Sequence, residues 1–232
     1  MLSSLVSSMP VYSADQVSTD PKRTICISGH REKSITPYNG DPVFRNITVQ
    51  SVKLMLARYI DMAAERGYDT FISGLATGTD LWAAEYILQK KKLNSSIKLI
   101  GAMPYLRHAD LFPSSERKVL AEIEQEADFL VTVDPDPDIV YNKADKKGSG
   151  QGQLYRNRNY YMVDRSSAVI AFFNSGSSFS GTSQTLSYAY RTGRKICSFG
   201  LEDIFSLIDR AGTDLRSISR EIAFLENVFD KE

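Results

Sequence analysis

Short apolar runs bounded by Gly, Pro, Asp or Ser alternate along this chain with longer segments of mixed polarity. The apolar runs have the length of buried strands and occupy residues 24–28, 70–73, 97–101, 129–133, 168–173 and 195–199. The segments between them predict helices over residues 47–66, 80–92, 113–126, 156–165 and 181–192. Because such alternation is typical of a parallel sheet covered on both sides, the sequence predicts an α/β fold with a Rossmann-like, mainly parallel sheet and helices on both faces.

The two ends of the chain fall outside this alternation. Residues 1–21 are rich in Ser and have neither a basic start nor a sustained apolar run, so we expect a flexible N-terminal tail and no signal peptide. Residues 22–200 carry the alternation and are expected to form the Rossmann-like domain. Residues 201–232 predict a C-terminal helical extension of one or two helices, with a break at Ala211-Gly212.

Composition narrows the class of protein. A chain of 232 residues that is 42% hydrophobic can bury one substantial core, and its 28 basic and 28 acidic residues give no net charge. Neutrality argues against nucleic acid or an anionic membrane as a partner. Cys26 and Cys197 lie in strand-like runs and are expected in the core, which fits a cytoplasmic protein. With two histidines and no Cys/His cluster, no metal site is expected, and we interpret His108 as an exposed polar residue and Trp82 as a packing aromatic.

The stretch from Gly74 to Glu85 carries the first candidate chemistry. It lies between a predicted strand and a predicted helix, and Gly74 and Gly78 allow close backbone approach and positive φ. The first N–H groups of the following helix could then hold a phosphate, although a plain turn capped by Thr77 or Thr79 would give the same pattern. The glycine spacing matches neither a Walker loop nor a dinucleotide-binding fingerprint.

Two carboxylates follow this turn. Asp80 stands at the start of the helix, where a cap is the ordinary role. Glu85 shares a helical stripe with Leu81 and Leu88, so we expect it to be mostly buried and paired with Arg31, Arg158 or backbone N–H groups. The pattern leaves open whether Glu85 forms a salt bridge or lines a ligand site.

Two more strand ends are polar and contain glycine. One is Ser28–Arg31, and the other is Ser175–Thr182, which opens a helix. The composition of residues 134–153 predicts a long loop, to which no role is assigned. This loop leads to Tyr155 and Arg158; tyrosine can stack on bases, and arginine can stack on bases and bind phosphate. Because the carboxyl ends of parallel strands share one edge of a sheet, we expect these turns to converge with the Gly74–Asp80 turn on one pocket.

Four motifs occur in order between about Thr24 and Phe199. They are Gly29-His30-Arg31; Gly74-x-x-x-Gly78-x-Asp80 with Ala83-Ala84-Glu85; Arg158-Asn159 with Met162-Val163-Asp164; and Gly181-Thr182 with Tyr188-Ala189. Together they resemble the YpsA-like branch of the SLOG superfamily, Rossmann-type proteins related to the DNA-processing protein DprA and to the Lonely Guy phosphoribohydrolases. The resemblance implies a pocket for a nucleotide or nucleotide derivative, used for sensing or, in some relatives, for hydrolysis.

Two departures bear on that function. Ser180 stands where relatives usually have a glycine, and Thr185 stands where the Lonely Guy enzymes have a glutamate, so their N-glycosidic chemistry is in doubt here. We therefore expect a nucleotide-binding sensor that acts on a partner protein; a nucleoside monophosphate hydrolase and DprA-like single-stranded DNA binding remain the alternatives. No cofactor and no catalytic residue is identified, and a homo-oligomer remains open. The candidate ligand-binding residues are Gly29, His30, Arg31, Gly74, Gly78, Thr79, Asp80, Glu85, Arg158, Asn159, Gly181 and Thr182.

Overall fold

A computed structural model describes residues 2–35, 41–140, 150–174 and 180–230. The strands of these residues form one eight-stranded sheet in the order β1-β2-β6-β5-β4-β3-β7-β8. Apart from the antiparallel β1–β2 pair, neighbouring strands are parallel, which confirms the predicted Rossmann-like α/β class. The strands are β1 (Leu2–Ser3), β2 (Pro10–Ser13), β3 (Thr24–Gly29), β4 (Thr70–Ser73), β5 (Lys98–Tyr105), β6 (Phe129–Asp134), β7 (Ala168–Phe172) and β8 (Lys195–Phe199).

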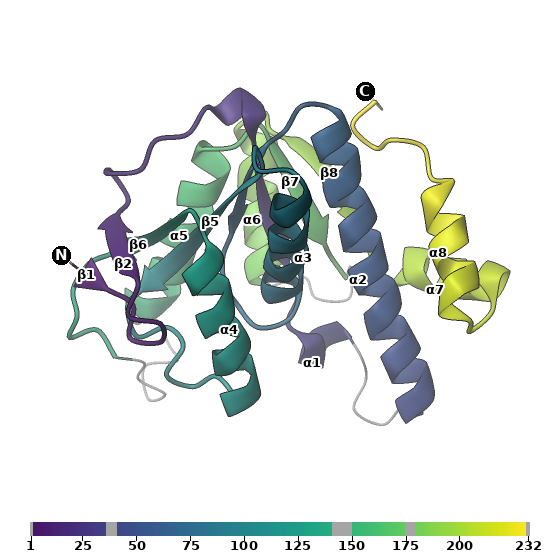
Figure 1. The fold of residues 1–232 in the computed structure, drawn as a ribbon, viewed down its shortest axis with the longest axis horizontal. Coiled ribbons are helices and arrows are strands. Elements are labelled where there is room, and N and C mark those ends of the chain that lie inside the picture. Colours follow the sequence, from purple (N-terminus) through teal and green to yellow (C-terminus); the bar gives the residue numbers. More distant parts are fainter. Residues whose placement is uncertain (1, 36–40, 141–149, 175–179, 231–232) are drawn as a thin grey trace.

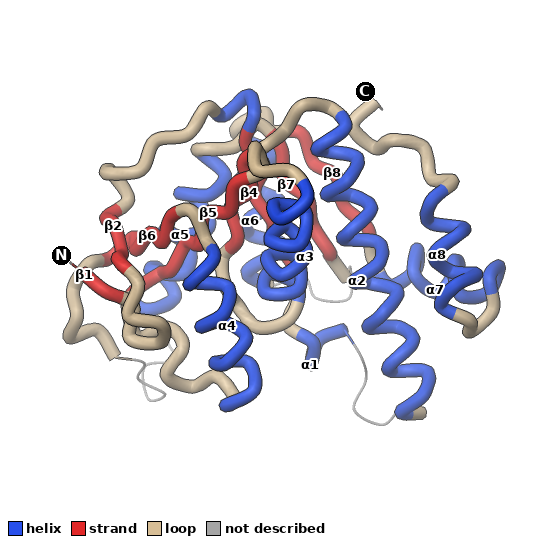
Figure 2. Tube along the Cα trace, in the orientation of Figure 1, coloured by secondary structure: helices blue, strands red, loops and turns tan. Residues whose placement is uncertain are grey.

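Helices cover both faces of this sheet (Figure 1). Helices α2, α3 and α4 lie on one face, with α7 and α8 beside α2, and helices α5 and α6 lie on the other (Figure 2). None of the helices in the described residues is long and apolar enough to cross a membrane. The helices are α1 (Glu32–Ile35), α2 (Pro42–Glu65), α3 (Thr79–Leu93), α4 (Ser114–Glu126), α5 (Gly150–Asp164), α6 (Gly181–Arg191), α7 (Leu201–Ala211) and α8 (Leu215–Ala223), with a 3-10 turn at Pro21–Arg23.

The core is divided by the sheet into two apolar layers. Alternate residues of β3 show the division: Ile25 and Ile27 pack into the layer under α2 and α3, and Cys26 packs into the layer under α5. Both cysteines are buried and free, as the sequence predicts, and burial raises the pKa of the Cys26 thiol to about 12. Because both faces of the central strands are buried, their sequences are continuous apolar runs. Such runs can be recognised in the sequence as strands.

The N-terminal segment packs on the sheet and is not the flexible tail expected from its composition. Strand β2 pairs with β6, and the rings of Tyr12 and Phe129 meet edge to face at 5.8 Å. The Ser4 hydroxyl donates a 2.5 Å hydrogen bond to the buried Glu124 carboxylate of α4. These contacts come from short, mostly polar stretches, and tertiary pairing supplies the order that local propensity does not.

Two helices begin earlier than their periodicity predicts. Asp41 accepts a hydrogen bond from the N–H of Val43 and Pro42 follows it, so α2 starts at Pro42 and not at Ile47. Helix α5 starts at Gly150, inside the segment 134–153 that the sequence predicts as a loop; of that loop, residues 141–149 lie outside the described residues.

The C-terminal extension forms two helices with the break at the expected place. Gly212 ends α7 with a φ of 75°. Beyond α8 the chain returns along α2 to β8, where Asn227 donates to the Met62 carbonyl at 3.0 Å and Lys195 donates to the Phe229 carbonyl at 2.9 Å. The extension is therefore joined to the main sheet by contacts with both α2 and β8.

The strand order fixes where a ligand can enter. From β3 the chain adds β4, β5 and β6 on one side of the sheet and then returns to add β7 and β8 on the other. Helices following β3 and β7 consequently diverge, and the space between the carboxyl ends of these two strands is the topological switch point of the sheet.

Candidate functional site

A cavity of about 290 Å³ opens at this switch point; we call it the strand-end pocket. It is bounded by the end of β3, by α3, by α5 and by the start of α6, the helix that follows β7. The predicted site residues that line it are Gly29, His30, Arg31, Asp80, Arg158, Asn159, Gly181 and Thr182. Within the described residues, the turns after β3 and β4 and the start of α6 therefore meet as the sequence predicts; residues 175–179 of the third turn lie outside them.

Three N–H groups of the turn Gly74–Asp80, from which a phosphate cradle is predicted, have acceptors within the protein. That of Leu75 meets the Ser73 hydroxyl at 3.2 Å, that of Ala76 meets Asp80 at 3.4 Å, and that of Thr79 meets the His30 carbonyl at 3.3 Å. The Thr79 hydroxyl also donates to the His30 carbonyl at 2.8 Å. This turn is a support that holds the β3 turn in place, and Thr79 and Gly74 lie behind the pocket lining.

Glycine is needed in this support for packing between turns. Gly78 has a φ of 88°, and a Cβ there would lie 2.8 Å from the backbone nitrogen of Glu32 and 2.9 Å from the His30 carbonyl oxygen. A Cβ on Gly74 would overlap the Arg158 guanidinium, and one on Gly29 would lie 2.4 Å from Thr79 Cγ2. Gly78 has the positive φ that the sequence predicts, and its close contacts show that the packing of the turns also requires glycine there.

Arg158 and Asp80 form a buried ion pair at the floor of the pocket. Arg158 Nη1 lies 3.5 Å from Asp80 Oδ2 and also donates to the Gly74 carbonyl. Burial raises the pKa of Asp80 to about 6, and the Arg158 charge opposes that shift. Burial likewise lowers the pKa of Arg158, with Asp80 opposing. The opposite charges of Asp80 and Arg158 therefore nearly compensate each other at the pocket. Asp80 Oδ1 and Arg158 Nε have no hydrogen-bond partner among the described residues.

His30 adds a third buried polar group to the same wall. Its ring stacks on Phe173 at 5.8 Å and meets Phe172 edge to face at 6.1 Å. Burial lowers the pKa of His30, so the imidazole is neutral at pH 7. Its Nε2 atom is buried and makes no hydrogen bond within the described part of the chain.

The start of α6 provides the best anion site in the pocket. Ser180 and Ser183 form a reciprocal capping box, with the Ser183 N–H donating to the Ser180 hydroxyl at 3.0 Å. The N–H groups of Gly181 and Thr182, in the first turn, have no acceptor within the helix and lie at the positive end of its dipole. Gly181 is exposed, and a Cβ there would meet only Asn159 Nδ2 at 3.9 Å, so an anion can reach this backbone.

Thr185 and Glu85 lie away from the pocket. Thr185 is buried and donates to the Gly181 carbonyl at 2.9 Å, so no acid or base stands at the position that the Lonely Guy enzymes use. Glu85 is half-buried in a shallow groove between α3 and α4 with Leu88, Val119 and Ile123, and forms no hydrogen bond or ion pair among the described residues. The predicted partners Arg31 and Arg158 are wrong because the Leu81–Leu88 stripe faces α4.

A second cavity, of about 320 Å³, adjoins the strand-end pocket and shares Arg31 and Tyr155 with it; we call it the His108 lobe. The sequence pattern does not reveal this cavity and predicts an exposed His108, whereas the side chain is buried at 6% exposure. The missed signal was the continuation of the β5 run, from Gly101 through Tyr105, into Arg107 and His108 at the same edge of the sheet.

The chain was compared with known proteins. A family model described as the YspA SLOG family matches residues 25–197. The uncharacterized SPbeta prophage-derived protein YoqJ of Bacillus subtilis (strain 168) is 28% identical over 149 residues, which cover 64% of this chain and 85% of that protein. UPF0398 protein BH1768 of Halalkalibacterium halodurans is 24% identical over 152 residues, covering 66% of this chain and 72% of that protein.

The fold is also similar to that of a solved structure. The X-ray structure of DNA processing protein A (DprA) from Streptococcus pneumoniae matches with a TM-score of 0.50, covering 96% of this chain and 73% of that chain, at 17% sequence identity. Similarity at this level of identity concerns the arrangement of helices and strands alone.

Proposed function

The chain belongs to the YspA SLOG family, and from that premise we propose that its strand-end pocket binds a nucleotide or a nucleotide-derived small molecule and reports its presence to a partner protein. One observation carries the proposal: three buried polar side chains, His30, Asp80 and Arg158, line one cavity, and each has an atom with no hydrogen-bond partner among the described residues. Buried polar atoms are usually paired, so a polar ligand that completes these bonds would stabilise the site.

The charge pattern of the pocket fits a ligand with a phosphate. Because Asp80 compensates Arg158, the exposed Arg31 and the first turn of α6 are the positive features left in the lining. Arg31 can form a bidentate contact with phosphate, and the α6 N–H groups can bind the same anion from the other side. Asn159 and neutral His30 are suited to the hydroxyl groups of a sugar.

The test is calorimetric titration with AMP, ADP, ADP-ribose, ribose 5-phosphate and inorganic phosphate. Gly181→Leu places an apolar side chain in the open mouth of the α6 site, so we expect it to weaken binding of every phosphate compound by tenfold or more. Glu85→Gln, a substitution in α3 outside the pocket, is the matched control and should bind as the wild type does. Equal affinity in Gly181→Leu and the wild type would contradict this placement of the anion.

A hydrolase is the second candidate, and Asp80 is the observation that favours it. Asp80 lines the pocket, and its Oδ1 atom has no hydrogen-bond partner among the described residues. Burial raises its pKa to about 6, which suits proton transfer near neutral pH. Free base released from a nucleoside monophosphate by the wild type, and lost in Asp80→Asn, would replace the sensor proposal by an enzymatic one. We expect no release above the uncatalysed rate.

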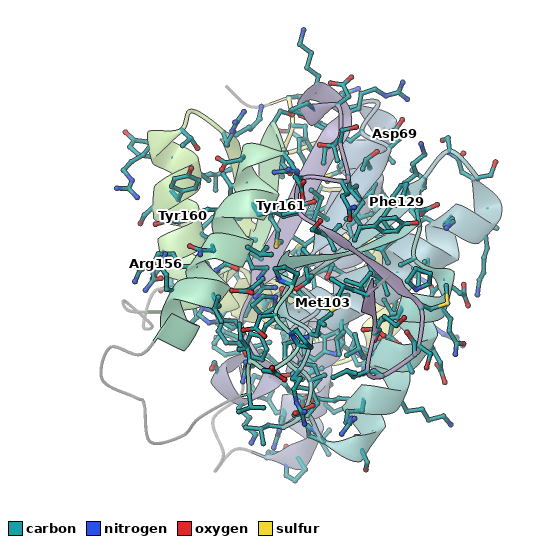
Figure 3. The ribbon with its side chains drawn as sticks, turned by 90° about the vertical axis from the view of Figure 1, so that its left-hand side faces the viewer. Asp69, Met103, Phe129, Arg156, Tyr160 and Tyr161 are labelled. Carbon is teal, nitrogen blue, oxygen red and sulfur yellow. The ribbon has the colours of Figure 1, made fainter. Side chains whose placement is uncertain are left out.

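Single-stranded DNA binding is the third candidate. The rings of Tyr160 on α5 and Tyr188 on α6 stack at 3.8 Å, and the Arg191 guanidinium lies 5.9 Å from the Tyr188 ring; Figure 3 shows Tyr160 on the side of α5 that faces α6. Such a platform can stack bases. Fluorescence anisotropy with a labelled oligonucleotide decides: tight binding by the wild type that Tyr160→Ala removes would favour DNA over a free nucleotide.

A further inference from the structure

The His108 lobe lies next to the strand-end pocket. Arg31 and Tyr155 line both cavities, and the Tyr155 hydroxyl lies 3.4 Å from that of Tyr105, which lines the lobe. Arg158 lies behind both, since it pairs with Asp80 in the pocket and its charge also acts on His108. Each cavity has about the volume of a small ligand-binding site, and their common lining residues place the two cavities side by side.

His108 is a buried polar group with unmet hydrogen-bonding capacity. It is 6% exposed, and neither Nδ1 nor Nε2 makes a hydrogen bond among the described residues. Burial lowers the pKa of His108 to about 4, with the Arg158 charge acting in the same direction and the Tyr105 backbone and Asp110 opposing. The ring is therefore neutral at pH 7, so one of its nitrogens donates and the other accepts.

The lobe is lined by several aromatic rings and by two arginines, Arg31 at its boundary with the strand-end pocket and Arg107. The rings of Tyr105, Tyr155 and Phe112 line the lobe, and Phe112 meets the His108 ring edge to face at 5.7 Å. Arg107 is engaged by Asp110, with Nε 2.8 Å from Oδ2. Stacking surfaces together with a neutral donor and acceptor suit a planar heteroaromatic ring and do not suit a second phosphate.

We propose that the His108 lobe holds the base of the nucleotide whose phosphate lies at the start of α6, and that His108 hydrogen-bonds the polar edge of that base. The inference rests on the proposed nucleotide binding and adds to it which part of the ligand occupies which cavity. Tyr155, at the boundary of the two cavities, then lies beside the sugar, and Arg31 keeps its contact with the phosphate. In this arrangement, residues at the end of β5 determine which base is preferred, and the start of α6 determines the affinity for phosphate.

The experiment compares ligands with and without a base. Wild-type protein is titrated with ribose 5-phosphate and with AMP, GMP, CMP and UMP. We expect at least one nucleotide to bind roughly tenfold or more tightly than ribose 5-phosphate, because only the nucleotide fills the lobe. His108→Phe removes both ring nitrogens and keeps a flat side chain; it should reduce this advantage by roughly tenfold and leave the affinity for ribose 5-phosphate unchanged.

A second variant tests the lobe without altering a buried residue. Leu111 lies at the rim and is 59% exposed, so Leu111→Trp can obstruct the lobe while the core stays intact. It should also abolish the nucleotide advantage and spare ribose 5-phosphate, and thermal melting checks that both variants are folded.

Each contrary outcome is distinguishable. Wild-type nucleotide affinity in folded His108→Phe and Leu111→Trp overturns the lobe assignment while leaving nucleotide binding intact. An equal loss for nucleotides and ribose 5-phosphate in these variants also overturns it, because the effect would then not concern the base. If wild-type protein binds none of these compounds, or binds an oligonucleotide alone, the proposed function fails and the lobe assignment fails with it.

Discussion

Arg158 Nη1 lies 3.5 Å from Asp80 Oδ2, and both side chains are more than nine-tenths withdrawn from solvent. The pair joins the end of β4 to helix α5, because Arg158 also donates to the Gly74 carbonyl. A buried pair of this kind is costly to break from one side, since the charge left behind has no partner. The pair therefore links the stability of the fold to the composition of the pocket.

Arg158→Met should destabilise the protein by about 3–5 kcal/mol, because it leaves the Asp80 carboxylate buried without its cation. Asp80→Asn combined with Arg158→Met removes both charges and should recover part of that loss. Urea denaturation of the wild type, both single variants and the double variant measures the coupling free energy. Additive single and double effects would show that the two side chains do not interact energetically.

Titration of Asp80 should contribute to the pH dependence of the free energy of unfolding. Its folded pKa, about 6, lies above the 3.8 of an ordinary aspartate, so the folded protein binds this proton more tightly than the unfolded chain does. The contribution of Asp80 to the free energy of unfolding is therefore largest below pH 3.8 and is lost as the pH rises to about 6. Denaturation of wild type and Asp80→Asn across this range should show the stability difference changing in that direction, and then levelling off above it.

His108 should act with the opposite sign. Its folded pKa, about 4, lies below the 6.5 of an ordinary histidine, so the unfolded chain binds this proton more tightly. The stability it contributes is complete above pH 6.5 and is lost as the pH falls toward 4. His108→Phe lacks the titrating group, so relative to the wild type it should gain stability as the pH falls through this window. A constant difference between the two proteins would mean that His108 is not buried in solution.

Gly78 and Gly67 both have positive φ but differ in their surroundings. The angles are 88° and 87°, and a Cβ meets backbone atoms within 3.0 Å at Gly78 and nothing within 4 Å at Gly67. Gly67→Ala should therefore cost about 1 kcal/mol for its positive φ alone. Gly78→Ala should cost about 1–3 kcal/mol more, because its ψ of −128° also lies outside the left-handed helical region and because the turns after β3 and β4 must move apart. Equal losses in thermal unfolding would show that these turns yield freely.

The sequence predicts the central fold well because each buried strand is a continuous apolar run that ends at a polar turn. It fails at the short strand Leu2–Ser3, whose order comes entirely from pairing with β2. Within the site, local motifs identify Gly29, Arg158 and Gly181. They do not show that Glu85 faces α4 or that His108 is buried, because helix phase and burial depend on which neighbours the tertiary structure brings.

A terminal segment of the chain lies at each edge of the sheet. At one edge of the sheet, β2 pairs with β6, and the two-residue β1 is the outermost strand. At the other edge, β8 is contacted by Val228 and Phe229. Exposed strand edges invite pairing with another molecule, and very short strands and covering segments are ways by which proteins prevent it. Copies of this chain that associate should consequently do so through helical surfaces, and trimming either end would create a template for aggregation.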